Sequence, residues 1–367
     1  MVAGAGGGVA GVGCNAVRAS PLLLAVLLTS GCVSTGSRLA LPARVDGLMH
    51  DYAGNAPGAS VLVLRDGQAL VHRSYGMADL EAQVAATPAT NYRLASVTKQ
   101  FTAAAILLLA QDGKLGIDDP VRRWLPSLPP VADSITLRQL LTHSSGLIDY
   151  EDLMAPDATG QVHDIDALHL LEKENRTYFP PGHGYRYSNS GYALLALIVG
   201  KASGRDYATF VRERIFKPLH MDGSVAYEQG ISTVPNRAYG YSFVDGGWQR
   251  TDQSSTSAVL GDGGIYSSID DLAKWDAALY DDRLLSDASR ALAFGPHVKV
   301  TDEPYHAYYG FGWRITDDTV WHSGETMGFR NVIVRWPKQH LTVVVLTNRN
   351  DPEPYLLALR IGALFRR

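Results

Sequence analysis

Short runs of apolar, β-favouring residues gather near both ends of the chain. Residues 59–76 hold two such runs around the letters R-D-G-Q at 65–68, which predicts a β-hairpin. A second pair of runs, at 331–336 and 341–347, flanks the turn P-K-Q-H. Both ends of the chain therefore predict antiparallel sheet. Further strands are predicted at 309–315 and 319–322, and a helix is predicted at 355–367.

The middle of the chain consists of helix-favouring segments separated by loops rich in Pro, Gly and Tyr. The first of these segments, 98–112, is rich in Ala and Leu and ends before Gly113. Strands at both ends with helices between them predict an α+β fold. In this fold an antiparallel sheet, built from both chain ends and flanked by helices, receives an inserted, mainly helical lobe. The other predicted helices are 136–142, 165–175, 191–203 and 206–216.

The first 32 residues have the layout of a secretory leader. Arg18 precedes an apolar run at 21–28, and the small residues of T-S-G-C follow at 29–32. The apolar run is too short to span a bilayer as a helix. We therefore expect a leader at 1–32, a linker at 33–44 and one domain at 45–367.

Both cysteines of the chain, Cys14 and Cys32, lie in this leader. The body can therefore hold neither a disulfide nor a cysteine metal site. Cys32 resembles the acylated cysteine of bacterial lipoproteins, although Thr29 stands where that pattern usually has Leu. We expect an exported, periplasmic protein that meets the membrane through a lipid on Cys32. The alternative is a secreted protein from which Cys32 is removed with the leader.

Charge and histidine spacing exclude other classes of function. The chain has 33 Lys and Arg against 37 Asp and Glu, so it has no basic excess with which to bind nucleic acid. His163, Asp164, Asp166 and His169 lie close together, but the eleven histidines show no H-E-x-x-H or H-x-H spacing. We interpret these four residues as the solvated start of a helix rather than a metal site, and we predict no metal and no cofactor.

The stretch R-L-A-S-V-T-K places Ser96 three residues before Lys99, at the start of a predicted helix. Residues i and i+3 share one helix face, so the amine can reach the hydroxyl. Serine is a weak nucleophile that needs a base, and a lysine supplies one where its surroundings favour the neutral amine. The backbone N–H of Ser96 also faces any oxyanion that forms at this helix end. By itself the S-x-x-K spacing is a weak signal, because it arises by chance in a chain of this length.

Two further motifs follow in order. Tyr187-Ser188-Asn189 offers a phenol, which acts as a general base when a nearby cation favours its ionised form. Its Asn189 amide has both a donor and an acceptor. His322-Ser323-Gly324 stands at the end of a predicted strand, whose edge can present N–H groups to a carbonyl under attack. Taken singly, these motifs are also explained by a Tyr-rich loop and a packed histidine.

Together the three motifs resemble those of the serine β-lactamase and penicillin-binding protein superfamily, from about Val45 to the C-terminus. Within it the chain resembles the class C β-lactamase-related branch, which includes D-alanyl-D-alanine carboxypeptidases, D-aminopeptidases and some esterases. T-L-R-Q-L-L-T-H-S-S-G-L at 136–147 and G-D-G-G-I-Y-S-S-I-D-D-L-A-K-W at 261–275 are very like this branch. Tyr-Ser-Asn and His-Ser-Gly point away from class A, whose motifs are S-D-N and K-T-G.

The resemblance implies roles for the matching residues. Ser96 would attack a carbonyl carbon and become acylated. Lys99 and Tyr187 would share the base work as a coupled pair, so no single base is assigned. Asn189 would hold the acyl side chain and steady Lys99. Water would then release the acyl group.

The third motif would complete the binding site. The resemblance implies that the oxyanion hole is made by the N–H groups of Ser96 and of Glu325, the residue after His322-Ser323-Gly324. His322 would replace the lysine of K-T-G and form a hydrogen bond toward Tyr187 or the negative end of the substrate. Glu325 departs from the small residue common at its position. We expect its carboxylate to favour neutral or amine-bearing substrates, unless Arg330 pairs with it or it points outward.

The sequence leaves the substrate open. The first hypothesis is an acyl-enzyme hydrolase that acts on a peptidoglycan D-Ala peptide, a β-lactam or a small ester or amide. One alternative is an esterase or D-aminopeptidase without β-lactam activity. Another, from a different class, is a catalytically idle protein that binds peptidoglycan or a partner. The presence of Ser96, Lys99 and Tyr187 favours the active enzyme. The oligomeric state is also open.

Overall fold

The computed structural model describes residues 35–157, 159–300 and 307–366. The predicted leader, with Cys14 and Cys32, lies outside the described residues. The described strands are β1 (Ala59–Arg65), β2 (Gln68–Tyr75), β3 (Met77–Asp79), β4 (Val84–Ala85), β5 (Tyr92–Arg93), β6 (Val225–Ala226), β7 (Tyr241–Val244), β8 (Gly247–Arg250), β9 (Ile265–Ser267), β10 (Val298–Lys299), β11 (Tyr308–Tyr309), β12 (Arg314–Ile315), β13 (Val320–Thr326), β14 (Phe329–Trp336) and β15 (Leu341–Thr347).

Helices supply most of the remaining regular structure. The α-helices are α1 (Thr35–Leu48), α2 (Lys99–Gln111), α3 (Val121–Trp124), α4 (Leu137–Leu141), α5 (Tyr150–Leu153), α6 (Asp164–Leu171), α7 (Asn189–Ser203), α8 (Tyr207–Val211), α9 (Leu260–Gly263), α10 (Ile269–Ala278), α11 (Asp287–Ala293) and α12 (Tyr355–Phe365). Short 3₁₀ turns lie at His50–Tyr52, Ala95–Thr98 (η2), Pro130–Ala132 and Pro337–Gln339, and a π turn at Arg212–Phe216. No helix among the described residues is long and apolar enough to cross a membrane.

The main sheet joins the two ends of the chain, as predicted. Its strand order is β10-β11-β12-β13-β14-β15-β1-β2, and every neighbouring pair is antiparallel. The first hairpin turns at Asp66 and Gly67, which have φ values of 50° and 75°. Two successive positive φ angles match the right-handed twist of the flanking strands. The predicted α+β fold is therefore confirmed.

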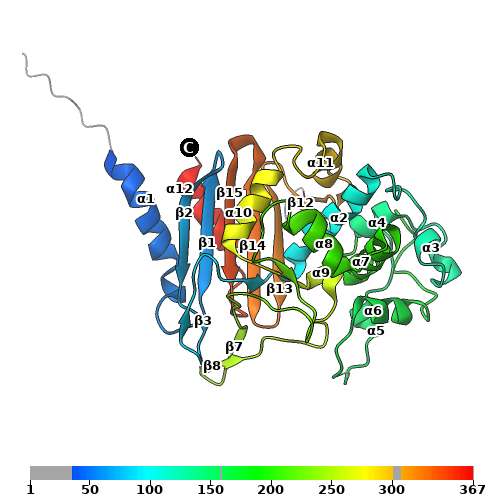
Figure 1. The fold of residues 1–367 in the computed structure, drawn as a ribbon, viewed down its shortest axis with the longest axis horizontal. Helices are drawn as coiled ribbons and strands as arrows, with labels where there is room; N and C mark the ends of the chain where they lie inside the picture. Colours follow the sequence, from blue (N-terminus) through cyan, green and yellow to red (C-terminus); the bar gives the residue numbers. More distant parts are fainter. Residues whose placement is uncertain (1–34, 158, 301–306, 367) are drawn as a thin grey trace, which may run out of the picture. The chain divides into compact units, whose positions relative to one another are not determined.

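The central strands are apolar on both faces because helices cover both faces. Val61 and Val63 of β1 pack with α12 in one cluster, whereas Leu62 and Leu64 pack with helices of the main core on the other face. Figure 1 shows α10 and α12 on opposite faces of the sheet. Successive strand residues point to opposite faces, so a run of apolar residues fits a strand that is buried on both sides.

A mainly helical region follows β5 in the chain and lies on the β13 side of the sheet, away from β2 (Figure 1). It contains α2 through α8, as the inserted lobe in the prediction requires. Thr136 begins α4 with a capping box to Gln139, and Gly204 ends α7 with a left-handed φ of 72°. The helices predicted at 165–175 and 206–216 are shorter as α-helices, ending at Leu171 and Val211.

One predicted segment differs from the structure, and another has regular structure that was not predicted. The interval 33–44 is helical from Thr35 onward, because α1 runs from Thr35 to Leu48, and its role as a linker stays a prediction. Its Leu, Ala and Arg residues favour helix. The mixed polarity of the segment hides this preference in the sequence, because it shows no regular apolar face. The single strand predicted at 309–315 is instead the hairpin β11–β12. Gly312, with a φ of 77°, allows the chain to reverse there.

Candidate active site

The nucleophile stands on a tight turn between a strand and a helix. After β5, Ala95 adopts a left-handed φ of 49°, and η2 carries Ser96 into α2. Left-handed backbone at a non-glycine residue is strained and is often kept at functional sites. Residues i and i+3 eclipse one another in a 3₁₀ turn. The Nζ atom of Lys99 accordingly lies 3.0 Å from Oγ of Ser96, as the S-x-x-K spacing predicted.

Lys99 is fully buried and has three polar neighbours. Its Nζ lies 2.8 Å from Oδ1 of Asn189, 3.0 Å from the backbone oxygen of Asp262 and 3.0 Å from Oγ of Ser96. The two carbonyl oxygens can only accept, so Lys99 donates to both. The third contact of Nζ is a hydrogen bond donated to Oγ of Ser96.

Two carboxylates hold Asn189, the first residue of α7, one through its backbone and one through its side-chain amide. The backbone N–H of Asn189 donates to Asp149 (2.6 Å), and its Nδ2 donates to Oε1 of Glu151 (2.9 Å). A carboxylate accepts only, so Nδ2 must face Glu151 and Oδ1 must face Lys99. The predicted contact between Asn189 and Lys99 is present. The sequence analysis missed Asp149 and Glu151, although both follow directly on the quoted stretch 136–147.

The Glu151 carboxyl is in an unfavourable place for a charge. Desolvation raises the pKa of Glu151, and the neighbouring Asp149 raises it further. The hydrogen bond from Asn189 and the charge of Lys99 oppose this rise. A carboxylate under these conditions is stabilised by any further cation that approaches it.

Tyr187 lies against Lys99 and a buried histidine. Nζ of Lys99 is 4.9 Å from the centre of the Tyr187 ring, and the imidazole of His143 is 4.3 Å from it on an inclined plane. Nδ1 of His143 accepts a hydrogen bond from the backbone N–H of Ser188, which fixes the middle residue of the Tyr187-Ser188-Asn189 motif. The Tyr187 hydroxyl is buried and has no hydrogen-bond partner among the described residues. Its hydrogen-bonding capacity is therefore unused in this structure.

His322 forms different hydrogen bonds from those expected. Its Nδ1 lies 2.6 Å from the backbone oxygen of Ser323, and its Nε2 lies 2.8 Å from the hydroxyl of Tyr309. The carbonyl can only accept, so Nδ1 carries the proton and Nε2 accepts from Tyr309. Burial, Arg314 and Lys99 lower the pKa of His322 well below its ordinary value. No bond between His322 and Tyr187 is formed in this structure, because both ring nitrogens have other partners. The alternative, a bond to the negative end of the substrate, stays a prediction.

Strand β13 passes directly over the nucleophile turn. A Cβ atom on Gly324 would lie 2.0 Å from the backbone oxygen of Leu94 and 3.2 Å from the nitrogen of Ser96. Only glycine allows this approach. Ser96, Asn189 and Glu325 all contribute to the wall of one cavity of about 50 Å³. The oxyanion hole proposed at the N–H groups of Ser96 and Glu325 stays a prediction.

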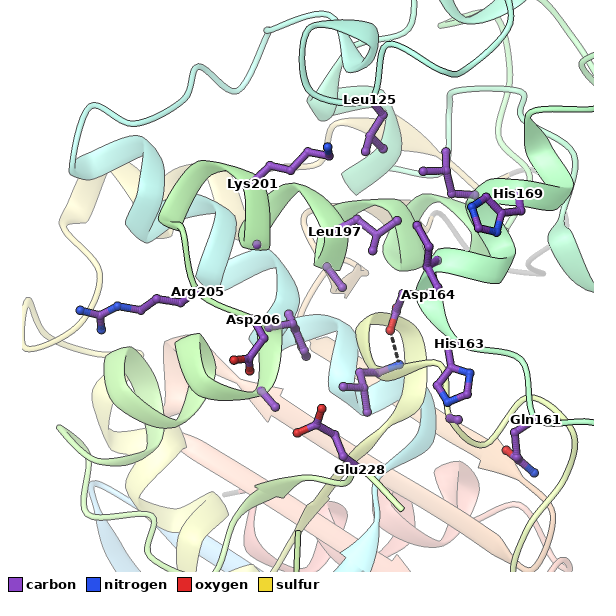
Figure 2. A pocket seen from close by; sticks show the side chains of 18 of the residues that line it. Leu125, Gln161, His163, Asp164, His169, Leu197, Lys201, Arg205, Asp206 and Glu228 are labelled. Atoms are coloured by element: carbon purple, nitrogen blue, oxygen red, sulfur yellow. Dashed lines mark hydrogen bonds between the residues drawn. The ribbon is translucent and has the colours of Figure 1, made fainter. Parts of the chain in front are cut away.

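A larger cavity of about 1180 Å³ lies elsewhere, between α6, α7 and α8 (Figure 2). Its wall contains neither Ser96, Lys99 nor Tyr187. We place the chemistry at the smaller cavity because the activated serine lies there, and size alone does not identify a reactive site. The remaining wall residues of the smaller cavity are Arg93, Ala95, Tyr150, Glu151, Thr256, Asp262, Gly263 and Thr326.

Comparison with known proteins identifies this arrangement. The family model described as Beta-lactamase matches residues 41–364. The chain belongs to the beta-lactamase family. Penicillin-binding protein 4* of Bacillus subtilis is 34% identical over 321 residues, which cover 82% of this chain and 70% of that protein. Protein flp of Staphylococcus aureus is 30% identical over 322 residues, and the match spans only 62% of its length.

A solved structure with the same fold is D-amino acid amidase from Ochrobactrum anthropi in complex with L-phenylalanine amide. It superposes with a TM-score of 0.74 at 26% identity and covers 89% of this chain and 96% of that one. This membership of the beta-lactamase family confirms the predicted resemblance and the predicted enzyme class. The chain is a serine hydrolase that works through an acyl-enzyme, so the idle binding protein is not favoured.

In this beta-lactamase-family site, the position of the Glu325 side chain shows whether its carboxylate can repel a substrate. Its side chain is 56% exposed, and Oε2 lies 3.7 Å from Nε of Arg330. The exception stated for this residue therefore holds, since Arg330 pairs with it and it points outward. Glu325 loses the repulsive role expected of it. The carboxylate that faces the reacting groups is Glu151, which the sequence analysis did not name.

Asp262 is a second acidic residue that the sequence analysis did not single out. Its backbone oxygen accepts from Lys99, and its carboxyl accepts the hydroxyl of Tyr150 (2.9 Å). Burial raises the pKa of Asp262 to about 8, with Lys99 acting in the opposite direction. Asp262 belongs to the G-D-G-G of the stretch 261–275, whose sequence indicated a part in shaping the site. No group of three or more His, Cys, Asp or Glu residues that could hold a metal lies within the described part of the chain.

Proposed function

We propose that the chain hydrolyses small amides and esters whose acyl part carries a free amino group. The observation that carries this proposal is the Glu151 carboxylate, which lies in the wall of the Ser96 cavity next to Asn189. An ammonium group on the substrate would relieve its desolvation and its repulsion by Asp149. Interactions of this kind select a substrate by the charge that the site leaves unpaired.

The proposed reaction begins with the neutral Lys99 amine. Oγ of Ser96 attacks the carbonyl carbon as its proton passes to the Lys99 lone pair. The N–H groups of Ser96 and Glu325 hold the resulting oxyanion. The proton then passes through the Tyr187 hydroxyl to the leaving nitrogen or oxygen, and an ester on Ser96 remains. Water attacks this ester along the reverse route and releases the acid.

The cavity volume supports small substrates. A short acyl side chain suits a space of about 50 Å³. The D-amino acid amidase, whose structure was solved with L-phenylalanine amide, is a related protein whose ligand joins an amine and an amide in one small molecule. This likeness supports the proposal.

The test compares two substrates that differ by one charge. We expect an alanine p-nitroanilide to have a KM about tenfold lower than its N-acetyl form, from loss of one charge-assisted contact. Glu151→Gln should remove this preference. Glu325→Gln, at the other glutamate in the wall, is the matched control and should keep it. Equal KM values for the two substrates in the wild-type enzyme would overturn the proposal, and Ser96→Ala gives the background rate.

A second candidate substrate is a β-lactam or a D-Ala peptide of peptidoglycan. The observation in its favour is the pairing of Glu325 with Arg330, which removes the expected repulsion of a substrate carboxylate. The name of the relative, penicillin-binding protein 4*, supports the same class. A time course of intact mass with benzylpenicillin tests it. A lasting adduct on Ser96 indicates a carboxypeptidase-like enzyme, and rapid lactam loss without an adduct indicates a β-lactamase. If there is neither an adduct nor lactam loss, this candidate is excluded.

We also propose that the enzyme is exported and anchored by a lipid on Cys32. The support is the order of Arg18, the apolar run 21–28 and the small residues before Cys32. Metabolic labelling with a fatty acid should mark the wild-type protein and not Cys32→Ser. A mature N-terminus beyond Cys32 would exclude the anchor and leave a secreted enzyme.

A further inference from the structure

The turn at Leu260–Gly263 carries a carbonyl that binds Lys99, and side chains hold this turn from two sides. On one side, Thr102 and Lys99 of α2 donate to two successive carbonyls, those of Gly261 (2.7 Å) and Asp262 (3.0 Å). On the other side, the N–H groups of Leu260 (2.9 Å) and Gly261 (3.0 Å) both donate to the carboxylate of Asp164. The turn thus lies between α2 and the first residue of α6.

Asp164 is set apart from the polar residues that surround it in the sequence. It is only 8% exposed, whereas the side chains of His163 and Asp166 are 61% and 46% exposed and cap the helix together. Figure 2 shows the Asp164 carboxyl turned toward the backbone of Leu260 at the edge of the larger cavity. Burial raises its pKa to about 6, and the two N–H bonds oppose that rise. The interpretation as a solvated helix start therefore fits its neighbours and not Asp164.

Close packing makes the position of the turn depend on these contacts. A Cβ atom on Gly261 would lie 2.2 Å from the backbone oxygen of Tyr192 in α7. A Cβ atom on Gly263 would lie 3.6 Å from Cα of Ala95, beside the nucleophile. The turn therefore touches both α7 and the Ser96 loop, so a small shift in it alters the surroundings of Lys99.

We propose that Asp164 is a positioning residue for the reaction. By holding the N–H groups of Leu260 and Gly261, it keeps the Asp262 carbonyl within hydrogen-bond distance of Lys99. That carbonyl and Oδ1 of Asn189 each accept one N–H group of Lys99, so the remaining position on Nζ faces Ser96 and carries the lone pair once the amine has lost its proton. This inference rests on the acyl-enzyme reaction of Ser96 and not on the preference for amine-bearing substrates.

The main consequence is a slower chemical step. In Asp164→Asn the amide nitrogen replaces one acceptor oxygen, so one of the two backbone N–H groups loses its partner. The turn can then relax away from Lys99. Asp164 is not in the wall of the small cavity, so a bound molecule loses no contact with it. Asp262 and Gly263 of the turn do lie in that wall, so we expect binding there to change less than the chemical step.

The test uses a fluorophosphonate, because this reagent carries no amine and reports the nucleophile directly. Oγ of Ser96 forms a bond to phosphorus, fluoride leaves, and the serine proton passes to Lys99. Intact mass gives the fraction of chains labelled, and the dependence on reagent concentration separates kinact from KI. We expect Asp164→Asn to lower kinact about tenfold or more, with a much smaller change in KI and an unchanged final labelled fraction.

The control is Asp166→Asn, which removes an exposed carboxylate two residues away and should leave kinact unchanged. A kinact for Asp164→Asn equal to that of the wild type would overturn the proposal. The proposal would also be overturned if fewer chains were labelled but each reactive chain kept the wild-type kinact. That result would mean that Asp164 only helps the protein to fold. If Asp164→Asn does not fold, Asp164→Ser keeps one acceptor and is tested in the same way. Failure of both to fold would also assign Asp164 to stability.

Discussion

At the scale of single residues, the site combines one buried amine with several acidic neighbours. Lys99 donates to Asn189 and Asp262, and Glu151 receives the other end of the Asn189 amide. Each contact has a fixed direction because carbonyls and carboxylates only accept. The same logic leaves Glu151 with a carboxylate oxygen for a substrate amine. Its raised pKa then makes substrate binding depend on pH.

For an amine-bearing substrate we expect KM to rise as the pH falls through the pKa of Glu151. Because this pKa lies above that of an ordinary glutamate, the rise begins at a higher pH than an exposed carboxyl would give. A KM profile for the alanine p-nitroanilide measures it. Glu151→Gln should have a high KM that does not change over the same range, and a rise of equal size in this variant would contradict the assignment.

Two buried histidines near Tyr187 link the site to stability. Burial lowers the pKa values of both His143 and His322, and nearby Lys99 lowers them further. The unfolded chain binds protons on these residues at about pH 6.5, whereas the folded chain does so only at lower pH. Below about pH 6.5 the unfolded state therefore binds more protons, so stability falls as the pH falls.

We expect His322→Gln to reduce the loss of Tm between about pH 7 and pH 5. A glutamine carries no charge at either pH, so one source of the proton uptake on unfolding is removed. His50→Gln is the control, because the side chain of His50 is 86% exposed. Thermal melts across this range test the prediction, and parallel Tm curves for wild type and His322→Gln would refute it.

At the scale of elements, the decisive contact is between β13 and η2. The strand lies so close to the nucleophile turn that a side chain at position 324 would overlap the oxygen of Leu94. This contact brings Glu325 and Ser96 into one cavity wall. The sheet edge therefore supplies geometry that neither element has alone.

Gly324→Ala should lower kcat/KM on the order of 100-fold while the protein stays folded. The added methyl group forces β13 away from Ser96, and a displacement of about 1 Å has an effect of this size. Gly247→Ala is the control, because a Cβ at that glycine would meet no atom within 4 Å. Ester hydrolysis and circular dichroism of both variants measure the outcome. Unchanged activity of Gly324→Ala would exclude a tight β13–η2 contact.

At the scale of the whole molecule, a buried ion pair joins a helix to the sheet made by the chain ends. Arg335 of β14 lies 2.7 Å from Asp276 of α10, and Thr342 of β15 donates to the same carboxylate oxygen. Side-chain exposures are 2% for Arg335 and 5% for Asp276. Removing one member of a buried pair leaves an uncompensated charge.

We expect Asp276→Ala to lower the free energy of unfolding by about 3 to 5 kcal/mol, because Arg335 would remain charged and buried. Asp318→Ala breaks an exposed pair with Arg366 and should change it by less than about 1 kcal/mol. Urea denaturation of both variants gives the values. Similar losses in the two variants would show that the buried pair has no special importance.

The sequence by itself determined the sheet, most helices and the reacting pair. The R-D-G-Q turn at 65–68 and the apolar runs beside it are local signals, since turn geometry and strand periodicity depend on adjacent residues. Ser96 and Lys99 were found for the same reason, because their spacing of three residues is enough to bring them together. The glycines inside 309–315 are a local signal for the turn between β11 and β12. The apolar residues around them favoured the single strand that was predicted instead.

Only the tertiary structure decided which residues surround that pair. Glu151, Asp164 and Asp262 reach Lys99 or its acceptors across many residues of sequence, and no local pattern separates them from solvated acids. His322 was expected to face Tyr187, but Tyr309 takes its Nε2. The outward position of Glu325 likewise depends on Arg330, its partner in the register of β13 and β14. Such contacts depend on how distant segments pack, so they follow from the fold and not from spacing along the chain.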